Sequence, residues 1–262
     1  MAAGTAELDY VANRLATNGF IAAQEEAAEL CDAAAGDGPR LRAMLERRLT
    51  GEPLAWITGR LRFCGVDVRV DPGVYVPRWH SEQLARRAAG RLPDEGVAID
   101  LCTGSGAIAR VLMRARPRAR VVATDVDERA VACATANGVE AHHGDLFEPL
   151  PPLLEGRVDV VVAVVPYVPT RELPMLQRDT FTFETALSYD GGPDGTTILR
   201  RVVVDSPRFV RPGGALLLEL GGDQADVLGD DLARLGYIDV AVIRDEEGDV
   251  RGIEATLGSR TR

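Results

Sequence analysis

From residue 97 onward, apolar runs alternate with stretches of helical periodicity. Apolar runs of this length favour strands that are buried on both faces of a sheet. Such runs lie at 97–104, 119–127, 139–147, 158–165 and 214–221, with helical stretches at 106–115, 128–138, 196–210 and 223–236. The alternation predicts a mainly parallel, doubly wound α/β sheet. Residues 237–257 read as two strands around a polar turn, so we expect seven strands that end in an antiparallel hairpin.

The first fifty residues have a different pattern, with apolar side chains at helical spacing. These side chains are Leu8, Val11, Leu15, Leu41, Met44, Leu45 and Leu49. The spacing predicts a small helical bundle over residues 1–58. Alternating valines at 66, 68 and 70, followed by the turn signal DPG at 71–73, predict a β-hairpin linker over residues 59–80. The α/β domain is then expected over residues 81–262.

A glycine-rich turn joins the first predicted strand to the first helix of this domain, with the sequence DLCTGSGAIA at 100–109. Gly104 and Gly106 allow a tight turn and a close approach of the backbone to a ligand. The spacing satisfies the fingerprint of dinucleotide sites, so a nicotinamide cofactor has to be considered. Asp125 ends the second strand, where a carboxylate can accept both hydroxyl groups of a ribose, as in NAD or in S-adenosylmethionine.

Three carboxylates bear on the choice between these cofactors. Asp100, Asp125 and Asp145 stand at the ends of three successive predicted strands. The carboxyl ends of parallel strands meet at one edge of the sheet, so these charges repel a pyrophosphate and attract a cationic sulfonium with its ammonium group. The pattern favours S-adenosylmethionine over NAD. An α/β domain without a cofactor, in which the acids cap surface turns, is the remaining alternative.

Composition narrows the function classes further. The 262 residues have a formal net charge of −10, and all 30 basic side chains are arginine. This balance disfavours direct DNA binding, which depends on neutralising phosphates. No apolar stretch is long enough to span a bilayer, and the N-terminus lacks a signal-peptide pattern, so we expect a cytoplasmic protein without membrane contact. The four scattered cysteines and the pair His142 and His143 lack the spacing of metal ligands, so no metal is predicted.

Several segments together resemble the protein-(glutamine-N5) methyltransferases that modify peptide chain release factors. Residues 46–78 are similar to that family's linker, and the motifs DLCTGSGAIA, ATDVD and GDLF are similar to its cofactor motifs. The segment YDGGPDGTTILRRV at 189–202 looks like the one that follows the family's catalytic strand. The resemblance implies a Rossmann-like class I methyltransferase domain that converts S-adenosylmethionine to S-adenosylhomocysteine. It also implies an N-terminal helical domain that docks a protein substrate.

The resemblance also implies roles for particular residues. It assigns the cofactor to Asp100, Thr103, Gly104, Ser105, Gly106, Asp125, Val126, Asp145 and Leu146. The family's fourth strand ends in Asn-Pro-Pro-Tyr, whose Asn oxygen and first Pro carbonyl hold the target amide while the Tyr ring packs over it. The aligned residues here are Val164, Val165, Pro166 and Tyr167. By this resemblance Val165, Pro166 and Tyr167 are the catalytic residues. Val164, Pro77 and Arg78 are expected to contact the substrate.

This chain departs from the family pattern at two places. Val164 replaces the Asn and has no side-chain acceptor, although the carbonyl of Val165 remains. The loss of a positioned polar group costs orders of magnitude in rate. The family continues its Pro-Arg with Pro-Glu-Thr-Glu, whereas Trp79 and His80 replace the Pro and the Glu here.

Three interpretations stay open at this point. The acceptor is a glutamine of a release factor, or it is another group, such as an amine, a carboxylate or a hydroxyl of a small metabolite. For such a group His80 would serve as a base if the hairpin brings it near Tyr167. The third interpretation is a protein that binds S-adenosylmethionine without turnover. DNA adenine methyltransferases use a similar strand end, but the net charge and the missing Asn argue against that class.

Overall fold

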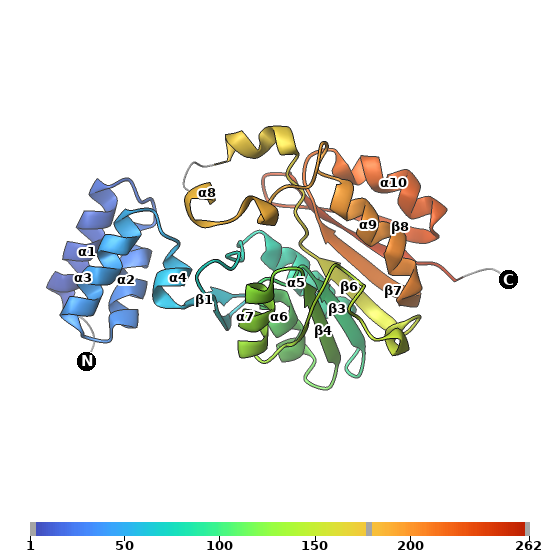
Figure 1. Cartoon of the computed structure of the whole chain (residues 1–262), viewed down its shortest axis with the longest axis horizontal. Coiled ribbons are helices and arrows are strands. Elements are labelled where there is room, and N and C mark those ends of the chain that lie inside the picture. Colours follow the sequence, from blue (N-terminus) through green and yellow to red (C-terminus); the bar gives the residue numbers. More distant parts are fainter. Residues whose placement is uncertain (1–3, 177–179, 260–262) are drawn as a thin grey trace.

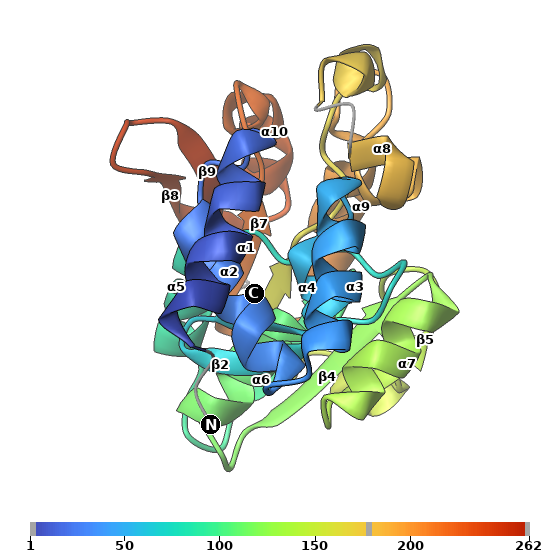
Figure 2. The ribbon, with the colours of Figure 1, turned by 90° about the vertical axis from the view of Figure 1, so that its left-hand side faces the viewer.

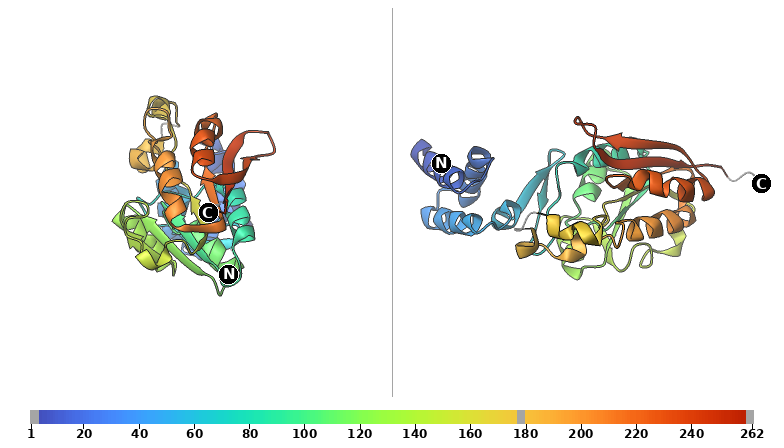
Figure 3. Two further views of the ribbon diagram at one scale, coloured as in Figure 1. Left: turned by 90° about the vertical axis from the view of Figure 1, so that its right-hand side faces the viewer. Right: turned by 90° about the horizontal axis from the view of Figure 1, so that it is seen from above.

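The structure, a computed structural model, describes residues 4–176 and 180–259, with the side chains of 180 and 181 left out. The predicted ranges 1–58 and 81–262 extend over residues 1–3, 177–179 and 260–262, which lie outside the described residues. A helical bundle occupies one end of the molecule and the sheet with its covering helices occupies the other (Figures 1 and 3). A short linker joins the two parts.

The N-terminal bundle forms from apolar faces at the predicted spacing. Its helices are α1 (Thr5–Thr17), α2 (Ala23–Ala34), α3 (Gly38–Leu49) and the short α4 (Leu54–Thr58). Leu15, Leu30 and Leu45 are buried in one apolar cluster shared by the first three helices. Asp37 caps α3, since its carboxylate accepts a hydrogen bond of 2.9 Å from the backbone N–H of Arg40.

The linker contains the predicted hairpin, but its turn lies earlier than the DPG signal. Strands β1 (Arg60–Phe63) and β2 (Val66–Arg69) pair antiparallel. They turn at Cys64 and Gly65, whose positive φ angles of 48° and 71° suit a tight two-residue hairpin. The DPG sequence forms a separate turn after β2, closed by a hydrogen bond of 3.1 Å from the N–H of Val74 to the carbonyl of Asp71.

The main sheet has seven strands in the order β5-β4-β3-β6-β7-β9-β8. The strands are β3 (Val97–Leu101), β4 (Arg120–Asp125), β5 (Glu140–His143), β6 (Val158–Ala163), β7 (Val210–Glu219), β8 (Tyr237–Arg244) and β9 (Val250–Leu257). Strands β3 to β7 run parallel, while β9 pairs antiparallel with both β7 and β8. The predicted mainly parallel sheet with a C-terminal antiparallel hairpin is therefore confirmed.

Helices cover both faces of this sheet (Figure 2). They are α5 (Ser81–Arg91), α6 (Ala107–Ala115), α7 (Glu128–Ala136), α9 (Thr197–Asp205) and α10 (Gln224–Arg234). Shorter pieces are η1 (Pro152–Leu154), η2 (Thr170–Met175), α8 (Thr180–Phe183), η3 (Ala186–Ser188) and η4 (Ser206–Arg208). The pattern did not predict α5. Helix α9 ends before the predicted limit because Pro207 cannot continue it.

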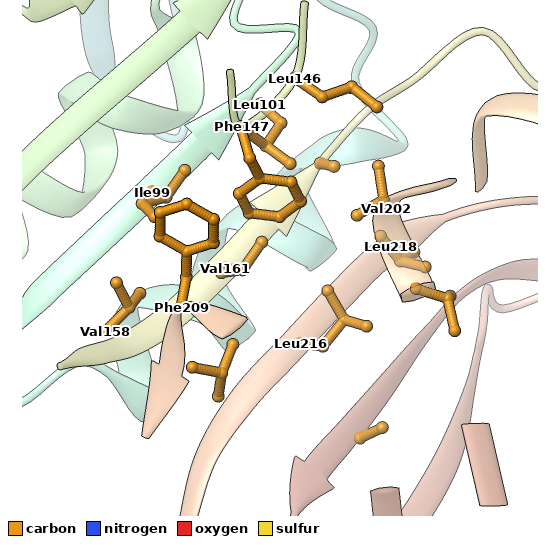
Figure 4. Packing of buried hydrophobic residues seen from close by; sticks show 14 of the residues in the cluster. Ile99, Leu101, Leu146, Phe147, Val158, Val161, Val202, Phe209, Leu216 and Leu218 are labelled. Carbon is orange, nitrogen blue, oxygen red and sulfur yellow. The ribbon is translucent and has the colours of Figure 1, made fainter. Parts of the chain in front are cut away.

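Strand β6 explains why its sequence is an unbroken apolar run. Val160 and Val162 pack into the cluster with α5 and α6, and Val161 and Ala163 pack into the cluster with α9 and α10. Successive side chains of a strand point to opposite faces, so both faces must be apolar. On the α9 side, Phe147 stacks on Phe209 with ring centroids 4.9 Å apart (Figure 4).

The strand order also determines where a ligand can bind. From β3 the chain builds outward to β4 and β5 on one side, and to β6 and β7 on the other. In sheets of this kind a crevice opens at the carboxyl ends of the strands, where the order reverses. No helix in the described part of the chain has the length and hydropathy that a bilayer crossing requires.

Candidate functional site

A cleft with a volume of about 320 Å³ opens at the carboxyl ends of the central strands. Its walls are the turns after β3, β4, β5 and β6, the linker at 73–80, residues 185–189 and part of α9. Segments far apart in the sequence therefore meet here. We call the part formed by the turns after β3 to β5 the cofactor end, and the part around Tyr167 the acceptor end.

Asp125 organises the cofactor end through backbone hydrogen bonds. Its two carboxylate oxygens accept bonds of 2.8 Å from the N–H of Gly104 and 3.0 Å from the N–H of Asp127. Burial raises the pKa of Asp125, and these two backbone donors oppose that rise. Gly104, Asp125 and Val126 all line the cleft. The turns after β3 and β4 are thus tied together at a carboxylate that faces the cleft.

Asp145 and Leu146 reach the same end from the turn after β5. The Asp145 carboxylate accepts a hydrogen bond of 2.7 Å from the guanidinium of Arg201 on α9. Both side chains are nearly half exposed, so solvent weakens this pair. Leu146 is buried and has a positive φ of 48°, which turns the chain under the cleft.

Asp100 lies beneath the glycine turn, not in the main cleft. It is 2% exposed, and its carboxylate accepts bonds of 2.6 Å from the hydroxyl of Thr103 and 3.1 Å from the N–H of Ala109. Burial raises the pKa of Asp100 to about 7, although both bonds oppose the rise. Asp100, Thr103 and Ser105 line a smaller adjoining cavity of about 40 Å³, together with Pro77.

The smaller cavity contains an unpartnered polar group and adjoins the main cleft. The hydroxyl of Ser105 is buried and has no hydrogen-bond partner among the described residues. Gly104 and Val164 line both this cavity and the main cleft, so the two spaces adjoin. A ligand that extends from the cleft beneath the glycine turn would meet Asp100 and Ser105 there.

Gly106 has a packing role in the glycine turn. A Cβ added to it would lie 3.0 Å from the Cγ2 of Val139 and 3.2 Å from the Cβ of Ala134. Its φ is 79°, which glycine adopts without strain. Neither cavity is lined by Gly106. It therefore lets α6 start close to the end of α7 and to Val139.

At the acceptor end, the residues after β6 line the cleft from Val164 to Val168. The carbonyl of Tyr167 accepts a hydrogen bond of 2.7 Å from the side-chain amide of Gln224. The segment DGGPDG packs directly on this backbone, since a Cβ on Gly195 would lie 2.2 Å from the Tyr167 carbonyl oxygen. A Cβ on Gly191 would lie 2.7 Å from the Cα of Tyr167. The glycines of this segment therefore allow the close packing that holds Tyr167 in place.

Arg78 joins the linker to the segment at 184–189. Its guanidinium donates a hydrogen bond of 2.7 Å to the hydroxyl of Tyr189, and it also contacts the buried carboxylate of Glu184. Glu184 in turn accepts a bond of 2.9 Å from the N–H of Val76 and a bond from the Tyr189 hydroxyl. Burial acts to lower the pKa of Arg78, but the interactions with Glu184, Tyr75 and Tyr189 together outweigh burial, so the pKa is raised. Arg78 also lies over the ring of Tyr75, 5.3 Å from its centroid.

Glu219, at the end of β7, connects Tyr167 with His80. It is 1% exposed, and its Oε1 accepts a hydrogen bond of 3.1 Å from the Tyr167 hydroxyl. The Nε2 of His80 lies 3.3 Å from the same oxygen, and Oε2 has no hydrogen-bond partner among the described residues. Burial and the nearby Glu219 charge raise the pKa of Tyr167, so the phenol stays protonated. Trp79, 72% exposed, packs edge-on against the His80 ring at 5.9 Å.

The structure thus brings together most of the residues predicted from the sequence. The main cleft is lined by Gly104, Asp125, Val126, Asp145, Leu146, Val164, Val165, Pro166, Tyr167 and Arg78. The smaller cavity is lined by Asp100, Thr103, Ser105 and Pro77, and Gly106 lines neither of the two cavities. Sequence reasoning missed Glu184, Tyr189, Arg201 and Glu219. Of these four, only Glu219 stands out in the sequence as a candidate functional residue, because its charge interrupts the apolar run LLLELG.

The residues present fit S-adenosylmethionine better than a dinucleotide. Asp100 and Asp125 lie at the carboxyl ends of β3 and β4, and Asp145 follows β5, so a diphosphate would be repelled there. The smaller cavity adds Asp100 and an unpartnered buried hydroxyl, which suit an ammonium and a carboxylate. No group of three or more His, Cys, Asp or Glu side chains that could hold a metal lies within the described residues.

Comparison with known proteins gives consistent matches. The family model of a methyltransferase domain matches residues 98–181. The release factor glutamine methyltransferase of Moorella thermoacetica is 40% identical over 84% of this chain and 79% of its own length. That of Geobacter sulfurreducens is 35% identical over 83% of this chain and 78% of its own.

A solved structure gives a similar result. The chain matches a chain of the E. cuniculi Mtq2-Trm112 complex, which is responsible for methylation of the eRF1 translation termination factor. The TM-score is 0.51 at 26% identity, over 71% of this chain and 99% of that one.

Proposed function

This chain belongs to the family of release factor glutamine methyltransferases, which use S-adenosylmethionine, and we propose that it methylates the side-chain amide of a glutamine in a peptide chain release factor. One observation carries the proposal. A single cleft holds the carboxylates Asp125 and Asp145 at one end and Pro166 with Tyr167 at the other. A cationic methyl donor and a planar acceptor can therefore lie side by side.

The cofactor end would hold the donor through its own residues. Asp125 would accept the ribose hydroxyls, Asp145 and Leu146 would contact the adenine, and Gly104 leaves room for the backbone to approach. Asp100, Thr103 and Ser105 would take the amino and carboxylate groups from the smaller cavity. Bound there, S-adenosylmethionine supplies a methyl group on a positively charged sulfur.

The acceptor end would position the amide nitrogen. An amide nitrogen is a poor nucleophile because its lone pair is delocalised, so catalysis depends on orientation and on acceptors for its N–H groups. The carbonyl of Val165 would accept one N–H, and the Tyr167 ring would form the wall against which the planar amide packs. Gln224 and the glycines at 191 and 195 keep this wall fixed.

The direct test is methyl transfer to a release factor. The purified chain is incubated with isotopically labelled S-adenosylmethionine and a bacterial release factor, and the label is located by peptide mass spectrometry. We expect one labelled glutamine, and loss of the label with Tyr167→Ala. An unlabelled release factor, with S-adenosylmethionine binding intact, would contradict the proposal.

Val164 supports a second candidate, in which the acceptor is a different group on a small metabolite. A valine at the cleft wall cannot accept a hydrogen bond from an amide, whereas an amine, a carboxylate or a hydroxyl needs no such acceptor. The variant Val164→Asn separates the two. A gain of about tenfold or more with the release factor supports the glutamine acceptor, and a loss of activity on a metabolite extract supports the second candidate.

Binding without turnover is the third possibility, and the same assay addresses it. Accumulation of S-adenosylhomocysteine with time excludes a pure binding role. The cytoplasmic location expected from the sequence remains part of the proposal.

A further inference from the structure

We propose that His80 accepts the proton that the acceptor nitrogen loses on methylation, and that Glu219 is the positioning residue that orients the His80 imidazole. The inference rests on the proposed function, because it takes the acceptor to be an amide nitrogen beside Tyr167. The base, His80, belongs to the acceptor end of this chain.

Three segments bring the groups together. His80, from the end of the linker, lines the cleft with its Nε2 3.3 Å from Oε1 of Glu219 at the end of β7. Tyr167, after β6, donates a bond of 3.1 Å to the same oxygen. The imidazole and the cleft wall are therefore fixed relative to each other by one buried carboxylate. His80 precedes α5, and its side chain makes no capping bond to that helix.

The contacts decide which ring nitrogen is free. With Nε2 facing a carboxylate, the neutral imidazole carries its hydrogen on Nε2 and leaves the lone pair on Nδ1. No hydrogen-bond partner of Nδ1 lies within the described residues. A carboxylate behind a histidine also stabilises the imidazolium that forms when Nδ1 takes a proton.

The other carboxylates of the cleft are already engaged. Asp125 accepts two backbone bonds, Asp127 is paired with Arg129, and Asp145 is paired with Arg201. Glu184, which is outside the cleft lining, is shared by Arg78, Tyr189 and the N–H of Val76. Among the lining residues in the described part of the chain, His80 is the one imidazole, and it lies at the acceptor end. The charged and titratable groups packed around this end are Glu219, Tyr167, Tyr75, Arg78, Glu184, Tyr189 and Arg251.

The chemistry needs such a base. The methyl carbon bonds to the amide nitrogen while its bond to sulfur breaks, and sulfur keeps that electron pair. The nitrogen then carries a positive charge and an acidic N–H. Transfer of that proton to Nδ1 of His80 leaves a neutral N-methyl amide, a neutral thioether and an imidazolium paired with Glu219. Because Val164 cannot accept an N–H from the substrate, this base matters more here than beside an Asn.

The main experiment compares His80→Gln with the unaltered enzyme in the labelled release-factor assay. We expect kcat to fall about 100-fold or more, the usual contribution of a general base, with the Kd for S-adenosylmethionine unchanged. The fall of kcat toward acid pH should also disappear. The matched control is His142→Gln on β5, which pairs with Glu140 away from the cleft and should leave kcat and its pH profile intact.

A second readout needs no turnover. The chain has three histidines, so ¹⁵N spectra of its imidazoles can be assigned with single His→Gln variants. We expect His80 in the free protein to carry its hydrogen on Nε2, and Glu219→Gln to shift its ring signals. Glu219→Gln should lower kcat about tenfold, in keeping with a positioning role.

The outcomes are separable. If the unaltered enzyme labels the release factor but His80→Gln keeps its rate and pH profile, the inference is wrong and the proposed function stands. If the His80 hydrogen lies on Nδ1, the inference is also wrong, whether or not the variant folds. If the unaltered enzyme transfers no methyl group to a nitrogen, both fall together.

Discussion

The two ends of the cleft are built in different ways. At the cofactor end, each functional group follows a strand within a few residues, and backbone N–H groups hold the key carboxylate of Asp125. At the acceptor end, groups from the linker, the end of β6, residues 184–189 and the end of β7 meet through side-chain contacts. The topology of the sheet fixes the first end, whereas the second depends on side chains from four distant segments.

The two ends should therefore respond differently to mutation. A backbone-held turn keeps its shape when one neighbour is altered, because its donors belong to the main chain. A network of buried side chains loses several contacts at once when one member is removed. We therefore expect mutations at the cofactor end to act on binding of the donor, and those at the acceptor end to act on transfer.

The largest effect is expected for Asp125→Ala. The change removes the acceptor proposed for the ribose and leaves the N–H groups of Gly104 and Asp127 without their partner. Each hydrogen bond to a charged group contributes about 1.5–3 kcal/mol, so the Kd for S-adenosylmethionine should rise about 100-fold or more. Isothermal calorimetry measures this, with Asp67→Ala on β2 as the control. A Kd within threefold of the unaltered protein would remove Asp125 from the binding site.

Arg78→Ala should act at the other end. It leaves the buried carboxylate of Glu184 without its cation and frees the segment at 184–189 from the linker. We expect kcat/KM for the release factor to fall about thirtyfold, while the Kd for S-adenosylmethionine changes less than threefold. The control is Arg86→Ala, whose partner Glu82 lies one turn away on the surface of α5. Equal losses in donor binding and transfer would show that the two ends are not independent.

A pH effect of about tenfold is expected from Asp100. Its raised pKa of about 7 means that the free protein holds a neutral carboxyl below that pH. A cationic ligand favours the carboxylate, so affinity should be full above about pH 7 and decline as the pH falls through it. Calorimetry at pH 8 and pH 6 tests this, and Asp100→Asn should flatten the profile. A profile that stays the same in Asp100→Asn would place the titrating group elsewhere.

The smallest effect is expected for Arg201→Gln. The Arg201–Asp145 pair is nearly half exposed, and such pairs contribute about 0–1 kcal/mol. The Kd for S-adenosylmethionine should therefore rise no more than about threefold as Asp145 loses its orienting partner. Arg208→Gln, which breaks a similar pair with Glu155 away from the cleft, should change nothing. A tenfold change with Arg201→Gln would mean that the arginine itself contacts the ligand.

The cofactor end could largely be predicted from the sequence, whereas the contacts at the acceptor end could not. The strands, their mainly parallel direction and the acids at their ends could be predicted from local patterns, because buried strands are apolar on both faces and alternate with helices. The family resemblance, confirmed by the relatives, added the role that we propose for Tyr167. The distant partners of Glu184, Tyr189 and Glu219 could not be predicted, since no periodicity says that residues 52 to 139 positions apart will touch.

Two local features of the structure also differ from what the sequence predicts. The turn of the linker hairpin lies at Cys64 and Gly65, because the pairing of β1 with β2 prevailed over the stronger local signal DPG. Asp100 was expected at the mouth of the sheet, but its bonds to Thr103 and Ala109 turn it under the glycine loop. Its proposed contact with the ammonium group therefore depends on the smaller cavity.

The placement of the two tryptophans gives this protein a built-in optical probe. Trp56 is 7% exposed and donates a hydrogen bond of 2.9 Å to the carbonyl of Val74, so its emission should be blue-shifted and constant. Trp79 stands in water against the His80 ring, and its red-shifted emission should be quenched by a charged imidazole. Fluorescence of the unlabelled chain can thus report docking of a substrate, and the charge on one histidine, in real time.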